Sequence, residues 1–479
     1  MERVIRGRNP DKLFYFFEEI SAIPRESYHE EKIADYLVAF AKERGLFVLR
    51  DKANNVFIRK DATPGMEGVA PILLQAHIDM VCEKNEGVEH DFRKDGIELE
   101  VRGDFLSAKG TTLGADDGAG VAVMLAALDG ELPRHPTLEC LFTSSEEVGL
   151  GGVCQFDFSV VSARRLINLD NEELGQVIAG SCGGVRTDIT MSCKREEKLK
   201  PTLHLALTGF AGGHSGENIN EGRMNANVCM GRLLCALHTL PGFGIVSIDG
   251  GSKLNAIPRE CRAVIALDDP DDAFDLAERA IADLSEDFSP LDQGAMLSIE
   301  SGDEAFSFTN EDSLRILALF QQVPNGVLAM SKEKEGLVEW SRNLGIVATD
   351  GDTLRFGYST RSGKEEQLDR SEAGLSKVGQ MLGATVAHFA RYPGWEYAPV
   401  SRLREEYLAA YEKALGKKAT VNVIHAGLEC GEIFARRPDM DIIAIGPTMY
   451  DIHSPSERMD LRSCEDFWKV LAVYFEGIL

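Results

Sequence analysis

The stretch ILLQAHIDM, residues 72–80, joins a run of apolar residues to a histidine and an aspartate. The apolar run is typical of a buried strand, and His77 and Asp79 stand at its end as an H-x-D pair. In an open α/β sheet the carboxyl ends of the strands share one edge, and ligands bind in the crevice there. An imidazole at that edge can bind zinc while a carboxylate accepts its other N–H. Alone, H-x-D is equally typical of an ordinary strand end.

Four further turns place acidic or histidine residues after an apolar, strand-like run. They read GTTLGADDGAG, LECLFTSSEEVGLGG, LINLDNEE and DIIAIGPTMYDIHSPSE, and they carry Asp116, Asp117, Glu146, Glu147, Asp170 and His453. Imidazole and carboxylate groups gathered at one edge of a sheet are the ligands that zinc prefers. The five turns together therefore predict a metal-dependent hydrolase with two adjacent ions.

The two acidic pairs suit different tasks. At a strand end, the carboxylates of Glu146 and Glu147 repel each other and need a cation close by. One can bind the cation while the other takes the proton of an activated water and passes it to the leaving amine; the alternative is a solvated turn. The carboxylate of Asp116 could bridge two cations. Asp117 is either a helix N-cap or a positioning residue.

The order of helical and strand-like segments predicts two kinds of domain. Residues 1–185 alternate amphipathic helices with apolar strands, which indicates an α/β fold with a mixed, largely parallel sheet and helices on both of its faces. Residues 186–397 read as two similar passes of strand, helix, two strands and helix, which predicts an inserted α+β lid domain with a duplicated pattern. Asn255 and Asn343 occupy equivalent places in the two passes. The α/β pattern returns over residues 398–479, which carry the last of the five turns, so we expect a discontinuous catalytic domain.

The composition makes some classes of binding partner unfavourable. The 479 residues exceed what one hydrophobic core organises, and the net charge of −26 argues against binding to nucleic acid or to anionic membranes. The sequence shows neither a secretory signal pattern nor an apolar stretch of about 20 residues, the length that crosses a membrane. The ten cysteines are scattered without a framework spacing, as in reduced proteins, so we expect a cytoplasmic location.

The segments HIDM, GADD, SSEE, LD and IHSPSE, in this order, resemble the motifs of the M20 zinc metallopeptidases. The resemblance spans both ends of the chain and the inserted segment, and it is strongest to bacterial dipeptidases of that family. It implies two zinc ions per subunit, for which cobalt or manganese can substitute. Gly118 departs from the pattern, because many members of the family have lysine there.

The resemblance also implies which residues bind the two ions. Asp116 would bridge them. His77 and Asp170 would complete the ligands of one ion, and Glu147 and His453 would complete the ligands of the other.

The same resemblance implies roles for the neighbouring residues. Glu146 would act first as the general base and then as the general acid. Asp79 would orient the imidazole of His77. The peptide bond between Asp116 and Asp117 would be cis.

Several residues outside the five turns are candidates for binding the substrate. His214, in the glycine-rich stretch GFAGGHSGENINEG, resembles a lid histidine that stabilises the oxyanion of the tetrahedral intermediate; the alternative is a loop histidine without a role. Asn255 and Arg361 also resemble lid residues that engage substrate, and an arginine can bind a free carboxylate through two parallel hydrogen bonds. Glu429 could recognise a free α-ammonium group or simply begin a helix, and His425 lies close to it in the sequence.

Together these features predict the hydrolysis of dipeptides with both termini free, Xaa-His and others, in which Glu146 takes the proton of a metal-activated water. An N-acyl amino acid deacylase or a tripeptidase on the same scaffold is an alternative. From another class, the chain could be a non-catalytic, metal-binding assembly protein, in which the extra carboxylate of Glu146 would have no purpose. Members of this family are often dimers, so a homodimer is one expectation, although a doubled lid could partly replace the second subunit.

Overall fold

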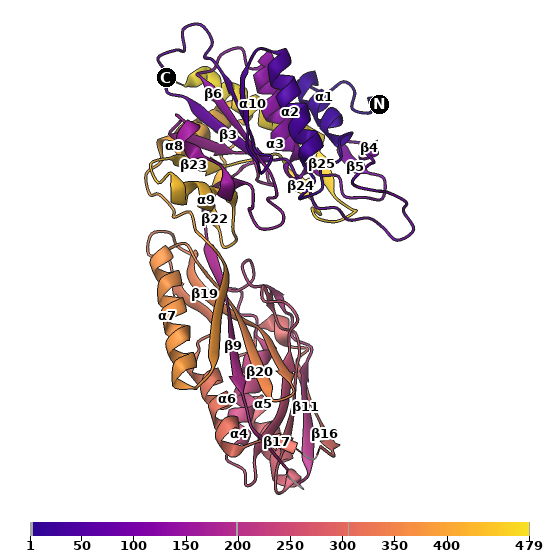
Figure 1. The fold of residues 1–479 in the computed structure, drawn as a ribbon, viewed down its shortest axis with the longest axis vertical. Helices are drawn as coiled ribbons and strands as arrows, with labels where there is room; N and C mark the ends of the chain where they lie inside the picture. The colour runs from indigo at the N-terminus through magenta and orange to yellow at the C-terminus, as the bar shows by residue number, and fades with distance from the viewer. Residues whose placement is uncertain (1–2, 198–199, 305, 479) are drawn as a thin grey trace. The chain divides into compact units, whose positions relative to one another are not determined.

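The structure, a computed structural model, describes residues 3–197, 200–304 and 306–478. The chain forms two compact units (Figure 1). Unit 1 combines segments from both ends of the chain, and unit 2 contains most of the segment between them. Unit 1 comprises Met1–Gly180, Tyr397–Val423 and Leu428–Leu479, and unit 2 comprises Ser181–Glu396 and Ile424–Gly427.

The short segment Ile424–Gly427 belongs to unit 2, although the sequence analysis placed it in the catalytic domain. The backbone N–H of Cys182 donates to the carbonyl oxygen of Ala426 at 3.1 Å. The Nε2 atom of His425 lies 2.7 Å from the hydroxyl oxygen of Ser341. These bonds join residues that are far apart in the sequence, so no local pattern indicates them.

Unit 1 is built around an eight-stranded mixed sheet in the order β1-β2-β6-β3-β7-β23-β8-β22. The central strands β6, β3, β7 and β23 are parallel neighbours, and the pairs β1–β2, β2–β6 and β23–β8 are antiparallel. The predicted mixed α/β architecture is confirmed, with the parallel pairs at the centre of the sheet. Since the carboxyl ends of parallel strands meet at one edge, the turns after these four strands leave the sheet together. The strands are β1 (Phe47–Arg50), β2 (Val56–Lys60), β3 (Ile72–His77), β6 (Leu138–Thr143), β7 (Arg165–Asn168), β8 (Gln176–Ser181), β22 (Thr420–Ile424) and β23 (Asp441–Ala444).

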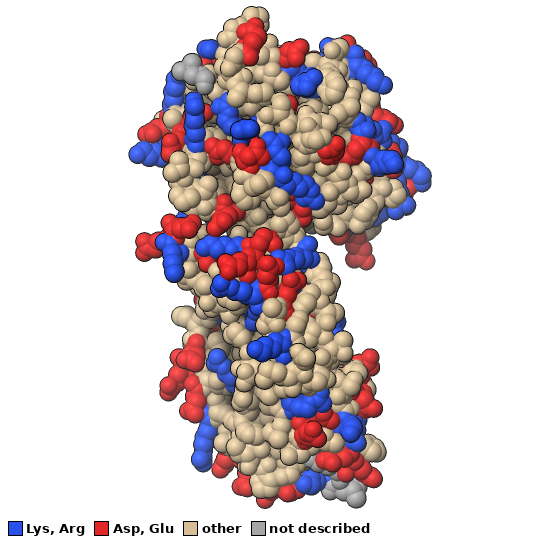
Figure 2. All heavy atoms as spheres, turned by 60° about the vertical axis from the view of Figure 1, so that its left-hand side comes forward, with Lys and Arg blue, Asp and Glu red and all other residues tan. Residues whose placement is uncertain are grey.

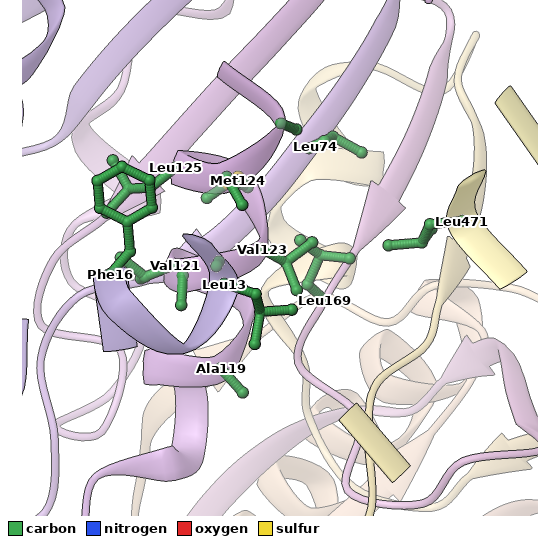
Figure 3. Packing of buried hydrophobic residues seen from close by; sticks show 14 of the residues in the cluster. Leu13, Phe16, Leu74, Ala119, Val121, Val123, Met124, Leu125, Leu169 and Leu471 are labelled. Atoms are coloured by element: carbon green, nitrogen blue, oxygen red, sulfur yellow. The ribbon is translucent and has the colours of Figure 1, made fainter. Parts of the chain in front are cut away.

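The helices of unit 1 follow the apolar patterns of the sequence. Helix α1 buries one face, including Leu13 and Phe16, whereas α3 is buried along its whole length, as expected of a helix that is apolar on all sides. These helices share one hydrophobic core with Leu74 of β3 and Leu471 of α10 (Figure 3). The helices are α1 (Asp11–Ser21), α2 (Glu31–Glu43), α3 (Ala115–Ala126), α8 (Arg402–Leu415), α9 (Glu429–Arg436) and α10 (Leu461–Gly477), with short turns at Ala127–Glu131, Val153–Gln155 and Phe158–Val160.

A smaller four-stranded sheet completes unit 1. Its strand order is β24-β25-β5-β4, and its described pairs are antiparallel. It brings a strand from the end of the chain, β25, beside β5 from the first part of the chain. The strands are β4 (Leu99–Arg102), β5 (Phe105–Ala108), β24 (Met449–Tyr450) and β25 (Arg458–Asp460).

Unit 2 contains one nine-stranded sheet whose described pairs are all antiparallel. Both of the passes that the sequence analysis distinguished contribute to this sheet, because β11 of the first pairs with β16 of the second, Leu205 opposite Ile299. Helix α7 packs along β9, β20 and β21 (Figure 1). The strands of the sheet are β9 (Gly183–Ser192), β11 (Thr202–Thr208), β13 (Gly244–Gly250), β15 (Cys261–Ala266), β16 (Met296–Gly302), β18 (Gly326–Met330), β19 (Val338–Asp350), β20 (Thr353–Ser362) and β21 (Thr385–Tyr392).

Helices α4, α5 and α6 of unit 2 lie in segments that were predicted to be helical. The second pass was predicted to end in a helix, but α7 ends at Met381 and the residues Thr385–Tyr392 after it form β21. Two pairs of short strands stand apart from the large sheet, and one of them, β12 with β14, holds His214 opposite Ala256. The remaining elements are α4 (Ala226–Leu237), α5 (Pro270–Ser285), the short turn Pro290–Asp292, α6 (Asn310–Gln322), α7 (Glu365–Met381), β10 (Arg195–Glu197), β12 (Gly213–His214), β14 (Ala256–Ile257) and β17 (Phe306–Phe308).

Charged side chains of both signs are interspersed over the face drawn in Figure 2. In unit 2, the guanidinium of Arg391 forms ion pairs with Glu365 at 2.7 Å and with Asp369 at 2.6 Å. Because basic and acidic side chains are interspersed, the face drawn in Figure 2 shows no large basic area. In the part of the chain that the structure describes, we find no helix with the length and apolar character needed to cross a membrane.

Candidate metal centre

The side chains predicted to bind metal lie near the carboxyl edge of the central strands of unit 1. For His77, the acidic pair after β6 and Asp170, this placement follows from the parallel direction of β3, β6 and β7, whose last residues open neighbouring turns. His77 is the last residue of β3, Glu146 and Glu147 follow β6, Asp170 follows β7, Asp116 lies in the first turn of α3, and His453 lies between β24 and β25.

Asp116 lies between two imidazoles. Its Oδ1 atom is 3.0 Å from Nε2 of His77, and its Oδ2 atom is 3.1 Å from Nε2 of His453. Oδ1 of Asp170 lies 3.7 Å from Nε2 of His77, and Oε2 of Glu147 lies 3.1 Å from Nε2 of His453. Each oxygen of Asp116 therefore faces a different histidine, and each histidine has a second carboxylate beside it.

Three overlapping groups of side chains have ligand atoms that all lie within 4.8 Å of one another. Two of the groups share Asp116, the carboxylate that was predicted to bridge two cations. The third joins a histidine of the first group to the acidic pair after β6. The groups are His77, Asp116 and Asp170; Asp116, Glu147 and His453; and His77, Glu146 and Glu147.

The electrostatics of this cluster favour bound cations. Burial raises the pKa of Asp170 and of Glu146 well above the usual range of carboxylic acids. Hydrogen bonds to Asp116 and Glu147 raise the pKa of His453 to about 10. The Oε1 atom of Glu147 is buried and has no hydrogen-bond partner among the described residues. Buried carboxylates this close repel one another unless cations lie between them, and oxygen and nitrogen donors of these kinds fit Zn²⁺, Co²⁺ or Mn²⁺.

Asp79 contacts two parts of the cluster. Its Oδ1 atom lies 3.4 Å from Nδ1 of His77, the imidazole that it was predicted to orient. Its carboxylate also accepts hydrogen bonds from the backbone N–H of Glu146 (3.0 Å) and Glu147 (3.2 Å) and from the hydroxyl of Ser27 (2.8 Å). Asp79 thus holds the turn after β6 as well as facing the imidazole, a second task that the H-x-D spacing does not reveal.

The backbone around the cluster has unusual conformations. The peptide bond between Asp116 and Asp117 is cis, as the resemblance implied. Oδ1 of Asp117 accepts a hydrogen bond from the backbone N–H of Gly120 at 3.0 Å, which is the bond of a helix N-cap. His453 has a φ of 59°, in the left-handed region that few non-glycine residues adopt. Such outliers concentrate at functional sites.

Glu429 begins α9 and is completely buried inside unit 1. Its Oε2 atom accepts hydrogen bonds from Nε2 of Gln75 (2.5 Å) and from the hydroxyl of Thr143 (2.7 Å). Its Oε1 atom has no partner among the described residues. Burial raises the pKa of Glu429 to about 7. The carboxylate therefore lies directly beneath the strand ends that carry the cluster.

Three buried charged residues that the sequence analysis did not single out contact the same turns. Glu30 accepts hydrogen bonds from the backbone N–H (2.9 Å) and the hydroxyl (2.8 Å) of Ser145. Arg25 and Glu457 bind the backbone near Asp116. Glu457 could have been found from the sequence, because it ends the motif IHSPSE. Nothing in the local sequence distinguishes Arg25 or Glu30 from surface residues.

In unit 2, three of the polar side chains that the sequence analysis named lie close together. The guanidinium of Arg361 on β20 donates to the hydroxyl of Tyr392 (3.1 Å) and to the carbonyl oxygen of His425 (3.4 Å). A Cβ atom on Gly216 would lie 3.0 Å from the ring of His214 and 2.5 Å from that same carbonyl oxygen. Burial and the nearby guanidinium lower the pKa of His214 and lower the pKa of His425 to about 3. This part of unit 2 therefore combines one cation with two neutral imidazoles.

The two asparagines at equivalent places of the two passes have different surroundings. The backbone carbonyl of Asn255 accepts a hydrogen bond from the N–H of Ser215, so this residue lies beside the loop of His214. The side chain of Asn343 is buried and donates to the carbonyl oxygens of Leu254 (3.0 Å) and Ala256 (2.7 Å). Asn343 thus fixes the backbone around Asn255.

Comparison with known proteins gives one consistent answer. The sequence model of the peptidase family M20/M25/M40 matches residues 73–477. The chain is 36% identical to the cytosol non-specific dipeptidase of Escherichia coli (strain K12), over 98% of each chain. The structure is similar to that of aminoacylhistidine dipeptidase from Vibrio alginolyticus, with a TM-score of 0.94 and 37% identity, over 98% of this chain and 97% of that one. The fold is also that of aminopeptidase PepT from Bacillus cereus, with a TM-score of 0.58 and 16% identity, over 98% and 99% of the two chains. The chain belongs to the peptidase family M20/M25/M40.

Proposed function

We propose that this chain is a zinc-dependent dipeptidase that hydrolyses dipeptides with both termini free, Xaa-His among them. The observation that carries the proposal is the position of Asp116, whose two oxygens face His77 and His453 at 3.0 and 3.1 Å. The proposal is supported by the identity of 36% to the cytosol non-specific dipeptidase of Escherichia coli over almost the whole of both chains. The similarity to aminoacylhistidine dipeptidase from Vibrio alginolyticus supports it further.

Two divalent ions fit the two ligand groups that share Asp116. His77 and Asp170 would hold one ion together with Asp116, and Glu147 and His453 would hold the other. Zinc suits this mixture of imidazole and carboxylate ligands, and cobalt or manganese can take its place. Bound there, the pair of ions would polarise the scissile carbonyl and make a water molecule acidic near neutral pH.

Glu146 would move the proton. Its side chain belongs to the same group as His77 and Glu147, which supports this role because a water held there would lie close to its carboxylate. The backbone bond from Glu146 to Asp79 holds it at the end of the turn. Its carboxylate would accept the proton of the attacking water and then deliver it to the departing amine, which makes it general base and general acid in turn.

Residues of unit 2 would bind the substrate. Arg361 would bind the free carboxylate of the dipeptide, because its Nε atom is buried and has no hydrogen-bond partner among the described residues. His214 would stay neutral and donate one N–H to the oxyanion of the tetrahedral intermediate. Asn255, beside the His214 loop, would contribute a further polar contact.

The free α-ammonium group of the dipeptide needs an anionic partner, and we propose Glu429 for this role through its unpartnered Oε1 atom. The two hydrogen bonds from Gln75 and Thr143 support equally well a structural role at the start of α9. A measurement of KM after substitution of Glu429 distinguishes the two roles. Loss of ammonium recognition would raise the KM only of dipeptides with a free amino terminus.

The deciding experiment compares unblocked Ala-His with N-acetylated Ala-His on protein stripped with a chelator and reloaded with zinc. Cleavage of the unblocked dipeptide alone, restored by zinc, is the expected result. Cleavage of the blocked substrate alone would make the chain a deacylase, and cleavage of tripeptides in preference to dipeptides would make it a tripeptidase. Two bound ions without cleavage of any of them would leave only a metal-binding assembly protein.

We further propose a cytoplasmic location and a homodimer. The ten free cysteines suit a reducing compartment, and the relative from Escherichia coli is named for the cytosol. Light scattering of the purified chain would measure the oligomeric state, and a mass of one subunit would contradict the dimer.

A further inference from the structure

Two buried ions of opposite charge lie on either side of the peptide that leads into Asp116. Arg25 and Glu457 are 2% exposed each, and neither forms a direct ion pair with the other among the described contacts. Both form hydrogen bonds with backbone atoms instead, and Gly114 bonds to each of them. A buried charge that is bound only by backbone groups holds those groups in place, because any movement would leave the charge unpaired.

Arg25 joins the turn after β3 to the turn before α3. Its Nη1 atom donates to the carbonyl oxygens of Ile78 (3.2 Å) and Asp79 (2.9 Å), and its Nη2 atom donates to the carbonyl oxygen of Gly114. The first two carbonyls directly follow His77 in the chain. One planar guanidinium thus fixes the distance between the backbone that carries His77 and the backbone that leads to Asp116.

Glu457 makes the matching connection to the loop of His453. Its Oε2 atom accepts hydrogen bonds from the backbone N–H of Leu113 (2.7 Å) and Gly114 (2.9 Å). Its Oε1 atom accepts from the N–H of Ala115 (2.7 Å) and is 3.4 Å from the N of Asp116. Four consecutive backbone N–H groups therefore converge on a single carboxylate that lies in the same loop as His453.

The glycines of the GADDG stretch leave room for the guanidinium. A Cβ atom on Gly114, which has a φ of +70°, would collide with Nη2 of Arg25 and lie 2.8 Å from Sδ of Met80. A Cβ atom on Gly118 would lie 2.8 Å from the same Nη2 atom and 3.4 Å from the ring of Phe17. Gly118 is the position at which this chain departs from the lysine of many M20 peptidases, and a side chain there would occupy the place of Arg25.

We propose that Arg25 and Glu457 are positioning residues that set Asp116 between its two histidines before metal binds. Glu457 acts chiefly on the group with Glu147 and His453, and Arg25 acts chiefly on the group with His77. The inference rests on the proposed function, because it concerns the same metal centre. Residues that orient metal ligands in this way change metal affinity by about 10- to 100-fold when they are replaced.

Zinc binding itself tests the inference, independently of catalysis. The zinc affinity and stoichiometry of the whole chain would be measured by competition with a chromophoric chelator for wild type, Glu457→Gln and Arg25→Lys. We expect each substitution to weaken one of the two zinc equivalents by about 10- to 100-fold. Gly118→Ala, which removes no hydrogen bond but crowds the guanidinium, should weaken zinc binding in the same direction as Arg25→Lys.

Two buried residues of unit 1 provide matched controls. Glu139, at the start of β6, also accepts backbone hydrogen bonds, from Ser162 (3.1 Å) and Ala163 (3.0 Å). Arg404 also donates only to backbone carbonyls, those of Ala398 (2.9 Å) and Pro399 (3.0 Å). Neither pair of partners carries or adjoins a residue of the metal centre, so Glu139→Gln and Arg404→Lys should keep both zinc affinities.

The outcomes separate this inference from the proposed function. Wild-type affinities in Glu457→Gln, Arg25→Lys and Gly118→Ala would overturn the inference while leaving the dipeptidase proposal standing. Equal losses in the test variants and in Glu139→Gln and Arg404→Lys would also overturn it, because the effect would then be general destabilisation. A wild-type chain that binds no zinc would overturn the proposed function itself.

Discussion

The polar side chains of interest in unit 1 are mainly carboxylates, whereas those of unit 2 are a guanidinium and two imidazoles. In unit 1, Asp116, Glu147 and Asp170 surround two histidines whose neighbours favour the protonated form. In unit 2, Arg361 lies beside histidines whose pKa burial lowers. Unit 1 is thus suited to hold cations, and unit 2 is suited to hold an anion such as a free carboxylate.

The two regions are also positioned by different means. Glu147 and Asp170 of unit 1 lie on turns at the ends of parallel strands, Asp116 lies in the first turn of α3, and buried charged residues hold the backbone nearby. Arg361 lies within β20, paired along its length with β9 and β19. Hence we expect substitutions at the carboxylates of the candidate metal centre to change metal binding or the chemical step, and substitution of Arg361 to change substrate binding alone.

The largest expected effect concerns the residue that both ligand groups share. Asp116→Ala should remove both ions and lower kcat/KM by at least about 10³-fold, because the loss of metal forfeits several kcal/mol of transition-state stabilisation. Metal content by elemental analysis, with dipeptide hydrolysis measured on the same sample, checks this. Retention of two ions would refute the bridging role of Asp116.

Glu146→Gln should separate chemistry from metal binding. We expect kcat to fall by about 10²- to 10⁴-fold, the usual contribution of a general acid and base, with zinc content unchanged. Both quantities would be measured on freshly loaded protein. Loss of zinc together with activity would instead make Glu146 a ligand and reduce the difference between it and Glu147.

In unit 2, Arg361→Lys should raise the KM of Ala-His by about 10- to 100-fold, since a lysine cannot form the two parallel hydrogen bonds to a carboxylate. The KM of the C-terminal amide of Ala-His should change little, and zinc affinity should stay at the wild-type value. Arg342→Lys is the control, because Arg342 is also buried but donates to Thr360 and Pro324. A fall in zinc affinity in Arg361→Lys would contradict the division of labour between the units.

The neutral histidine of unit 2 should make stability depend on pH. The pKa of His425 in the folded chain is about 3, below its ordinary value of 6.5, so the unfolded chain takes up a proton first as the pH falls. The stabilisation is fully present above pH 6.5 and is lost as the pH falls toward 3. Between these pH values, the free energy of unfolding changes by up to about 1.4 kcal/mol per pH unit because of this histidine.

Urea unfolding at pH 7 and pH 5 would measure this dependence in wild type and in His425→Gln. In the variant, the free energy of unfolding should differ less between pH 7 and pH 5 than it does in wild type. His238→Gln, which replaces an exposed histidine at the end of α4, serves as the control and should keep the wild-type difference. An unchanged difference in His425→Gln would mean that this imidazole is protonated in the folded chain.

The smallest expected effect concerns Tyr392, whose hydroxyl accepts a hydrogen bond from Arg361 at 3.1 Å. Tyr392→Phe removes that bond, worth about 1 kcal/mol, and should raise the KM of Ala-His about fivefold with kcat unchanged. The ring itself should stay, because Gly184 and Gly427 leave room for it. Tyr358→Phe, a buried tyrosine of the same strand as Arg361, should leave the KM unchanged.

Much of the metal centre could be predicted because its signals are local. His77, Glu147 and Asp170 follow apolar strands, and the parallel direction of β3, β6 and β7 brings them together. Asp116 opens a helix, whereas His453 lies in the loop between β24 and β25. The cis peptide bond after Asp116 came from the resemblance rather than from any local pattern. The mixed α/β fold followed from the alternation of helical and strand-like segments.

The remainder depends on contacts between residues far apart in the chain. Arg25 binds a carbonyl 89 positions further on, and Glu457 binds an N–H 344 positions back, so neither contact has a spacing that a sequence pattern can reveal. The membership of Ile424–Gly427 in unit 2 likewise depends on the hydrogen bond from Cys182 to Ala426 and on the contact between Ser341 and His425. Burial of a charged residue depends on the whole fold and cannot be recognised from the residues next to it in the sequence.

The order of strands in unit 1 bears on how the protein is made. Strand β23 lies between β7 and β8 in the sheet, yet it follows both of them, and every segment of unit 2, in the sequence. Until β23 is synthesised, the edge of β7 has no neighbour on that side and is open to pairing with other chains. The histidine that completes the metal centre follows β23 and arrives later still. A chain that ends before His453 therefore lacks one of the three residues in the group that Asp116, Glu147 and His453 form.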